Sequence, residues 1–209
     1  MMQINKRGIR NCIWGLLGLM LFLIILKYDL AISLAINSLR SPRLDSIMFF
    51  VEKISMGVIV IVPLVFVLMG KKWGKLRNWT VSLLGAYAIT LLLKIIVARA
   101  RPFSLGLNTP AELVDPAYSK WDFSFPSNHA STAFSSFFFI PSGIWRLSWL
   151  LISVVIIFSR VYFGLHYLSD VVAGAAIGLG VSYLASKYGD KFLEIKALDK
   201  LKYRRKKNR

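Results

Sequence analysis

Long apolar runs recur along the whole sequence, and they constrain the fold more than any other feature. A bilayer core of about 30 Å needs roughly 20 helical residues to cross it. Only 18% of the residues are charged, against about 25% in a typical soluble domain. Six segments approach spanning length, namely 11–27, 55–70, 79–97, 129–142, 147–164 and 167–186. The sequence therefore predicts an all-α, polytopic membrane protein with a six-transmembrane-helix bundle.

Two segments depart from a plain spanning pattern. The fourth run, "HASTAFSSFFFIP", is short and rich in Ser and Thr, so we expect it to pack inside the bundle with one end near water. Residues 28–54 mix apolar and charged positions, which predicts an interfacial helix after the first span. We see no internal repeat, and we expect a single domain over 1–209 with a basic tail at about 187–209.

The distribution of positive charge predicts an orientation. The net charge is +17. With six spans, both termini share a side with the loops at 71–78 and 142–148, and that side holds 18 of the 27 Lys and Arg residues. Because cytoplasmic loops are enriched in Lys and Arg, we expect both termini to be cytoplasmic in a plasma-membrane protein. The tail is expected to contact anionic membrane lipids rather than nucleic acid, and the sequence indicates no obligate protein partner.

The first polar cluster is "KIIVARARP", at the outer end of the third span. Lys94 and Arg101 are seven residues apart, which corresponds to two helical turns and places both on one side of a helix. Pro102 is expected to end that helix. Arg99 is expected to extend to the membrane interface, as basic side chains near helix ends commonly do.

The second cluster is "FPSNHAST", which opens the fourth span. A proline in the first turn and capping residues such as Ser127 and Asn128 are ordinary features of a helix start. By itself this pattern is consistent with a capped helix and an incidental His129. The same geometry also directs free backbone N–H groups to one point, where an anion can bind.

The third cluster is "SRVYFGLHYLSD". Arg160 lies at the outer end of the fifth span and His166 at the turn into the sixth. Asp170 follows His166 by four residues, so its carboxylate can accept the N–H of one imidazole nitrogen and leave the other as a lone-pair donor. Taken alone, this pair is equally consistent with a satisfied polar contact.

All three clusters map to one membrane face, and their conjunction is more informative than each cluster. Ionisable groups in membrane spans are candidates for a functional site. Cations near helix N-termini suit a phosphate group. A histidine backed by a carboxylate suits a nucleophile, and a second histidine suits the acid for a leaving group.

These residues resemble the three-part signature of the type 2 phosphatidic acid phosphatase superfamily, K-x6-R-P, P-S-G-H and S-R-x5-H-x3-D. The order and the internal spacing agree. The matching residues are Lys94, Arg101 and Pro102, then Pro126, Ser127 and His129, then Ser159, Arg160, His166 and Asp170. Asn128 stands where the family usually has Gly, and Asn is the least costly replacement if the position needs a positive φ.

The resemblance implies phosphoryl transfer without a metal or another cofactor. It makes His166 the nucleophile, Asp170 the residue that orients it, and His129 the acid and then the base. It assigns phosphate binding to Lys94, Arg101, Ser127, Asn128 and Arg160. We see no cage of Asp and Glu near these positions that would hold a metal.

The implied substrate is a lipid phosphate, either a phospholipid or an isoprenoid lipid. Among bacterial relatives the sequence looks most like the phosphatidylglycerophosphate phosphatase B type. Undecaprenyl diphosphate, phosphatidate and diacylglycerol pyrophosphate are the alternatives. An anion transporter would need charges at mid-membrane depth, whereas these charges lie at the outer ends of the spans. The soluble haloperoxidase branch of the family, which binds vanadate, does not fit six spans.

Overall fold

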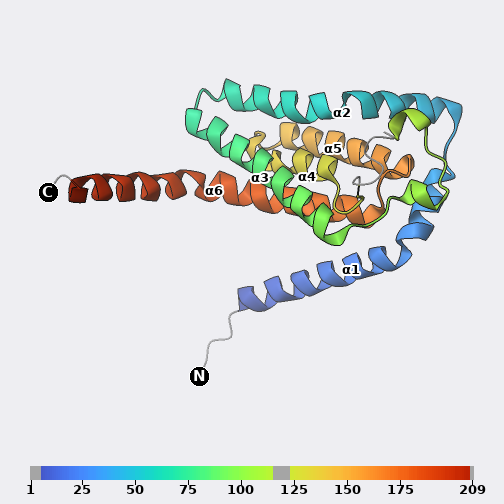
Figure 1. Cartoon of the computed structure of the whole chain (residues 1–209), viewed down its shortest axis with the longest axis horizontal. Coiled ribbons are helices and arrows are strands. Elements are labelled where there is room, and N and C mark those ends of the chain that lie inside the picture. Colours follow the sequence, from blue (N-terminus) through green and yellow to red (C-terminus); the bar gives the residue numbers. More distant parts are fainter. Residues whose placement is uncertain (1–5, 115–122, 208–209) are drawn as a thin grey trace.

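All the regular secondary structure in the described part of the chain is helical. The computed structural model describes the backbone of residues 6–114 and 123–207 and the side chains of residues 8, 10–114 and 123–191. Figure 1 shows the arrangement, which contains no strand within those residues. The helices are α1 (Lys6–Asn37), α2 (Pro42–Met69), α3 (Trp73–Val97), α4 (Asn128–Ser135), α5 (Ile144–Tyr162) and α6 (Leu168–Lys207), with 3₁₀ turns η1 (Pro102–Leu105), η2 (Ala111–Leu113) and η4 (Phe137–Phe139).

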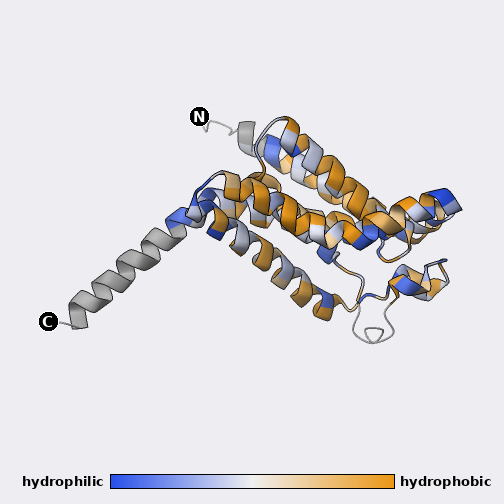
Figure 2. Ribbon diagram, turned by 90° about the horizontal axis from the view of Figure 1, so that it is seen from above, coloured by the Kyte–Doolittle hydropathy of each residue, from blue (hydrophilic) through white to orange (hydrophobic). Residues whose placement is uncertain are grey.

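Five of the described helices are long and apolar enough to cross a membrane. They are α1, α2, α3, α5 and α6, and Figure 2 shows how apolar residues dominate them. The expected count of six spans is not confirmed, because the fourth segment forms only the short helix α4 followed by η4. Residues 130–135 of α4 are all buried, as expected for a helix packed inside the bundle. The all-α, multi-span membrane architecture is confirmed.

The expected interfacial helix at 28–54 is also not confirmed. α1 continues to Asn37, and α2 begins at Pro42 after a short turn. Ser41 caps α2 by accepting a hydrogen bond from the Leu44 N–H at 3.4 Å, and Pro42 occupies the first turn, where a missing N–H costs nothing. Arg40 pairs with Asp45 at 2.8 Å. The charges that suggested an interface therefore close a helical hairpin.

The main apolar core lies between α2, α4 and α5. It contains Ile59 from α2, Phe134 from α4, and Trp149 and Ile156 from α5. The Trp149 indole N–H donates to the Ala133 carbonyl at 3.1 Å, which satisfies its one polar group. The buried α4 is thus fixed on one side by apolar packing and an indole hydrogen bond.

Two glycines of α6 let α4 approach from the other side. A Cβ atom at Gly174 would lie 2.5 Å from the Ser127 carbonyl oxygen, and one at Gly178 would collide with the Ser131 carbonyl oxygen. The glycines are four residues apart, so they lie on one face of α6. Small residues at such contacts let helix backbones approach closely. This contact brings the first turns of α4 and α6 together.

The helices alternate in direction, so that one end of the bundle gathers several helix termini. Asn37, the last residue of α1, donates to the Tyr162 carbonyl at the end of α5 at 2.9 Å. The Tyr162 hydroxyl donates to Asp45, in the first turn of α2, at 2.5 Å. The end of α3 and the starts of α4 and α6 lie at the same end. The backbone of α6 continues away from it to Lys207 (Figure 1), while the tail side chains beyond residue 191, expected to contact lipids, lie outside the described residues.

Candidate active site

The structure brings the residues predicted from the three motifs to one end of the bundle. The alternation of the helices explains this, because α3 and α5 end where α4 and α6 begin. The charges of Arg101, Lys94, Arg160 and His129 all act on the buried His166 ring. The eight predicted residues are Lys94 in the last turn of α3, Arg101 beyond it, Ser127, Asn128 and His129 at the start of α4, Arg160 in α5, His166, and Asp170 in α6.

His166 has different partners on its two ring nitrogens. Nδ1 lies 3.5 Å from the Asp170 carboxylate and 3.5 Å from the Ser124 hydroxyl. Nε2 lies 3.3 Å from Nη1 of Arg101. The four-residue spacing of His166 and Asp170 does not lie within one helix, because α6 begins at Leu168. The contact forms instead across the turn that enters α6, and it leaves Nε2 on the side of the cations.

Asp170 is completely buried, and several donors converge on its carboxylate. Oδ2 accepts the backbone N–H of Tyr167 at 2.8 Å and the hydroxyl of Ser124. The Tyr167 contact resembles the acidic half of a capping box, in which a carboxylate in the first turn satisfies the N–H before the helix. Oδ1 accepts Nη1 of Arg99 at 2.9 Å. Ser124 and Arg99 were not among the predicted site residues.

Lys94 and Arg101 both reach the site, although the reason given from sequence was wrong. α3 ends at Val97, and Ala98 adopts a left-handed conformation, so Arg101 is not two turns further along the same helix. Arg101 donates to the Leu165 carbonyl at 2.6 Å. Lys94 donates to the carbonyls of Phe123 and Ser124. Both side chains are buried, which strengthens their attraction for an anion.

Arg160 has a carboxylate partner that the motifs do not contain. It forms an ion pair with Glu52 of α2, and the Ser159 hydroxyl donates to the other oxygen of Glu52 at 3.0 Å. Within the described part of the chain, Nε of Arg160 is buried and has no hydrogen-bond partner. Arg160 is therefore fixed by Glu52, while its buried Nε donor remains unsatisfied among the described residues. Glu52 was part of the segment interpreted as interfacial.

The first turn of α4 has the geometry of a capped helix. Ser127 is the N-cap, and its hydroxyl accepts the Ala130 N–H at 3.5 Å. Its own N–H donates to the Asp170 carbonyl at 3.0 Å, which ties α4 to α6. Asn128 is the first helical residue and does not have a positive φ. The condition under which Asn would replace a strained Gly is therefore not met, and Asn is accommodated as an ordinary helical residue.

The expectation that Arg99 extends to the membrane interface is wrong. Its guanidinium bridges two carboxylates, 2.9 Å from Asp29 of α1 and 2.9 Å from Asp170. Its side chain is 24% exposed, against 3% for Asp29 and 0% for Asp170. A sequence signal existed, since Asp29 is an acidic residue in an apolar span.

Burial and positive charge keep His166 neutral. Burial lowers the pKa of His166 well below its ordinary value, and the charges of Arg101, Lys94 and Arg160 lower it further. At neutral pH the ring therefore carries a lone pair. The contact between Nδ1 and Asp170 assigns the ring proton to Nδ1, so the lone pair is on Nε2.

A comparison with family models shows the family of the chain. Residues 75–193, more than half of the chain, match the model of the PAP2 superfamily. The chain belongs to the PAP2 superfamily. Helices α1 and α2 lie outside the matched segment, whereas all eight predicted residues lie within it.

Curated relatives of this PAP2 protein are phosphatases of lipid phosphates. It is 31% identical to lipid A 4'-phosphatase from Bacteroides thetaiotaomicron in an alignment that covers 72% of each chain. It is 28% identical to undecaprenyl-diphosphatase from Sulfolobus acidocaldarius in an alignment that covers 72% of this chain and 73% of the relative. As a PAP2 protein of this architecture, the chain is a membrane lipid phosphatase and hence a hydrolase.

Solved structures share the PAP2 fold. The phosphatidylglycerolphosphate phosphatase from Bacillus subtilis superposes with a TM-score of 0.63 at 24% identity, covering 83% of this chain and 94% of that one. LpxE from Aquifex aeolicus superposes with a TM-score of 0.60 at 22% identity, covering 77% and 95%. These likenesses support the fold.

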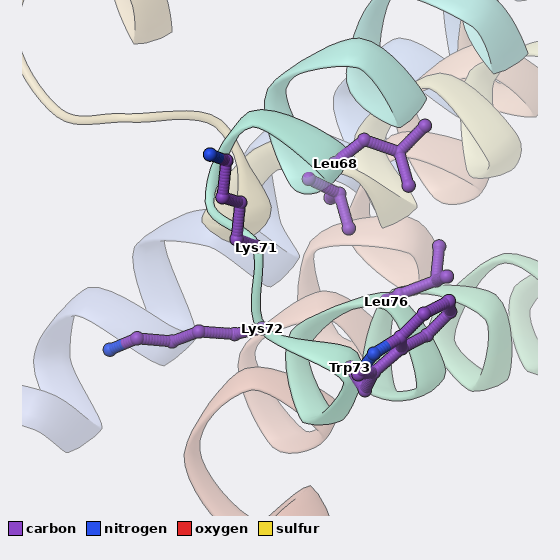
Figure 3. A pocket seen from close by; sticks show the side chains of 6 residues that line it. Leu68, Lys71, Lys72, Trp73 and Leu76 are labelled. Carbon is purple, nitrogen blue, oxygen red and sulfur yellow. The ribbon is translucent and has the colours of Figure 1, made fainter.

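A pocket at the other end of the PAP2 bundle carries none of this chemistry. It has a volume of about 250 Å³ and surrounds the α2–α3 turn (Figure 3). The ammonium groups of Lys71 and Lys72 point away from Leu68, Trp73 and Leu76. No predicted site residue lines it. Among the described residues, no group of three or more His, Cys, Asp and Glu could hold a metal ion.

Proposed function

We propose that this chain hydrolyses a phosphomonoester on a lipid headgroup through a phosphohistidine at His166. The observation that carries the proposal is the arrangement around that ring. Asp170 faces Nδ1, while Nε2 faces Arg101 and has a lone pair. A nucleophile needs a free lone pair directed at the substrate and a partner that stabilises the cation formed after attack.

In the first step, Nε2 of His166 attacks phosphorus, and the bond between phosphorus and the lipid oxygen breaks. Burial and the charges of Arg101 and Lys94 lower the pKa of His129 to about 4 in the free protein, and the negative charge of the bound phosphate raises it again. His129 therefore takes up a proton in the complex and donates it to the departing oxygen, which leaves as the lipid alcohol. Asp170 stabilises the positive charge that the ring acquires. Lys94, Arg101 and Arg160 bind the equatorial phosphate oxygens, together with Ser127, Asn128 and the N–H groups at the start of α4.

In the second step, His129 takes a proton from water, and the water oxygen attacks the phosphohistidine. The bond between nitrogen and phosphorus breaks, inorganic phosphate leaves, and His166 regains its lone pair. The free Nε donor of Arg160 suits this cycle, because it is available to the phosphate while Glu52 holds the other end of the guanidinium.

The substrate that we propose is phosphatidylglycerophosphate, which yields phosphatidylglycerol. Acyl chains can remain in the bilayer while the headgroup enters a polar site at the membrane surface. We place the site at the outer face of the plasma membrane, because the basic loop at 71–78 lies at the opposite end of the bundle. The function does not require a bound metal, since three cations are available to offset phosphate charge.

Undecaprenyl diphosphate is the second candidate substrate. The relative from Sulfolobus acidocaldarius bears the name undecaprenyl-diphosphatase, and that ligand also presents a terminal phosphate at a membrane surface. Phosphatidate and diacylglycerol pyrophosphate remain further options.

Phosphate release from a panel of lipids tests both the reaction and the substrate. The panel contains phosphatidylglycerophosphate, undecaprenyl diphosphate and phosphatidate in detergent micelles, with excess chelator. We expect the highest kcat/KM on phosphatidylglycerophosphate, no release by His166→Ala, and labelled phosphate retained on the protein in His129→Ala. Full activity of His166→Ala would contradict the mechanism, and a preference for undecaprenyl diphosphate would replace the substrate.

A further inference from the structure

Helix α1 buries only two of its described side chains, and both are polar. They are Asp29 and Ser33, whereas the other described side chains of the helix are exposed or half-buried. Figure 1 shows α1 diverging from the bundle toward its N-terminus, so contact is made near its C-terminal end. A buried carboxylate in a membrane-spanning helix is costly unless it is paired. The position of Asp29 therefore calls for an explanation.

Asp29 is paired with Arg99 and with the first turn of α6. Its Oδ2 lies 2.9 Å from Nη2 of Arg99 and accepts the hydroxyl of Ser169. Its Oδ1 accepts the backbone N–H of Ser169 at 2.9 Å. Asp29 thus binds the arginine and, at the same time, the residue that precedes Asp170.

Both terminal nitrogens of Arg99 are hydrogen-bonded, and its guanidinium packs on an aromatic ring. Nη1 donates to Asp170 at 2.9 Å and to Ser169 at 2.8 Å. The guanidinium lies 3.8 Å from the centroid of the Tyr167 ring, in a cation–π contact. An arginine fixed at both ends of its planar fork defines the position of each carboxylate it binds.

The two oxygens of the Asp170 carboxylate face different partners, Arg99 and His166. Arg99 occupies Oδ1, so Oδ2 is the oxygen that faces Nδ1 of His166. Rotation of the carboxylate would break the Arg99 contact, the Ser124 contact or the Tyr167 contact. The orientation that matters for His166 is therefore fixed from the side opposite to the substrate.

We propose that Arg99 and Asp29 are positioning residues for the reaction, acting on His166 through Asp170. The inference rests on the function proposed above and extends it to a helix outside the segment matched by the family model. Asp29 holds Arg99, Arg99 holds Asp170, and Asp170 orients the nucleophile. Helix α1 is thus a part of the active site although it does not contact the substrate phosphate.

The test compares Arg99→Gln, Arg99→Lys and Asp29→Asn in the full-length protein with phosphatidate in detergent micelles. We expect Arg99→Gln and Asp29→Asn to slow phosphohistidine formation by about 10-fold to 100-fold, as loss of an orienting partner commonly does. KM should change by less than about threefold, because no phosphate contact is lost. Arg99→Lys keeps the charge but loses the fork and should show an intermediate rate.

A pH profile separates positioning from loss of structure. Removing the Arg99 cation leaves the Asp170 charge uncompensated, which favours protonated His166, so the acid limb of kcat/KM should move up by about 0.5 to 1 pH unit. Asp29→Asn removes an anion, so the acid limb of kcat/KM in this variant should not move to higher pH. The substrate phosphate titrates equally in all variants. The titratable and charged groups that act on His166 are Arg101, Lys94, Arg160 and His129. Those that act on Asp170 include Arg99 and Asp29.

Two variants serve as matched controls. Ser33→Ala alters the other buried position of α1, and Asp45→Asn breaks a different ion pair at the same end of the bundle. Both should keep the wild-type acid limb and a rate within about threefold of wild type. All variants are compared by thermal melting in detergent.

The outcomes are distinguishable. Wild-type rates of phosphohistidine formation in both Arg99→Gln and Asp29→Asn would overturn the inference while leaving the proposed function intact. An upward shift of the limb in Asp29→Asn, or none in Arg99→Gln, would also overturn it. If Arg99→Gln does not fold, Arg99→Lys and Asp29→Asn decide the matter by their rates. Absence of phosphohistidine in the wild-type protein would refute the proposed function instead.

Discussion

At the scale of single residues, the two nitrogens of His166 experience opposite surroundings. Asp170 lies beside Nδ1 and Arg101 beside Nε2. Because burial and nearby cations lower the pKa of His166, the ring stays neutral when the pH falls below the ordinary histidine pKa of about 6.5. It is protonated only at a pH below that lowered value. The groups that we propose to bind phosphate thus also keep the proposed nucleophile unprotonated.

This dependence gives a prediction for Arg101→Gln. Arg101 is the cation with the largest influence on His166, so its removal raises the His166 pKa. The acid limb of kcat/KM should therefore move to higher pH than in the wild type, when both are measured on phosphatidate from pH about 4.5 to about 8.5. The substrate itself titrates near pH 6, so only the difference between the proteins is interpreted. Coincident limbs would contradict the assignment of the nucleophile.

Asn128 supports a second prediction at this scale. Since the residue is helical and needs no positive φ, Gly is not required there. We expect Asn128→Gly to retain activity within about 10-fold of wild type, with any change appearing as an altered preference across the lipid panel. An inactive wild type that becomes active in Asn128→Gly would show that the asparagine blocks the site.

The site residues that could be predicted from the sequence differ from those that could not in how far along the chain their partners lie. Each motif is short, so Lys94, His129 and His166 could be recognised from local spacing. Arg99 and Asp29 are separated by 70 positions, and Ser159 and Glu52 by 107. Nothing local indicates such pairs, because their contacts exist only after the helices pack.

At the scale of elements, the contact between α4 and α6 determines where the proposed phosphate-binding turn at the start of α4 lies. Gly174 and Gly178 leave room for the backbone of α4. Through this contact Ser127 reaches the Asp170 carbonyl. The burial of the fourth segment could be predicted from its short, Ser- and Thr-rich sequence. The end of its α-helix at Ser135 could not, because eight helical residues followed by a 3₁₀ turn give the same apolar pattern as a continuous helix.

Gly174→Ala tests this contact. Its Cβ would lie 2.5 Å from the Ser127 carbonyl oxygen, so α4 must move away from α6, at a cost of about 1 to 3 kcal/mol. We expect a lower melting temperature and a marked loss of phosphate release. Gly180→Ala is the matched control on the same helix, because a Cβ there meets nothing within 4 Å. Equal activity of the two variants would refute the role of the contact.

The hairpin between α1 and α2 was missed for a different reason. Charged residues among apolar ones resemble an interfacial helix in sequence. In the fold, Arg40 and Asp45 neutralise each other beside the turn. The helix-start signal Ser41–Pro42 is present in the sequence, but the mixed composition of residues 28–54 favours an interfacial helix.

At the scale of the whole molecule, the helices alternate between two ends that differ in chemistry. One end holds the candidate site, and the other holds the basic α2–α3 turn. We propose that the site end faces outward, as the positive-inside rule implies. The alternation follows from the order of apolar runs, and it could be predicted without knowing any tertiary contact.

Cysteine labelling in intact cells tests this orientation. Cys12 is the only cysteine, so Cys12→Ser gives a background free of thiols. Glu112→Cys lies on an exposed turn near the site, and Trp73→Cys replaces a residue that is 83% exposed at the other end. We expect a membrane-impermeant maleimide to label the first variant in intact cells and the second only after permeabilisation. The reverse pattern would invert the topology.

The polar contacts that dock α1 also have a consequence for the order in which the helices assemble during synthesis. Apolar surfaces contribute little to helix association within lipid, so the polar contacts of Asp29 with Arg99 and Ser169 are the ones that dock α1. Asp29 precedes its partner Ser169 by 140 positions, which a ribosome translates in about 7 to 28 s. During that time α1 lies in the bilayer without the neighbours it will have in the folded protein. Helix α1 can therefore take its place in the bundle only after the start of α6 has been translated.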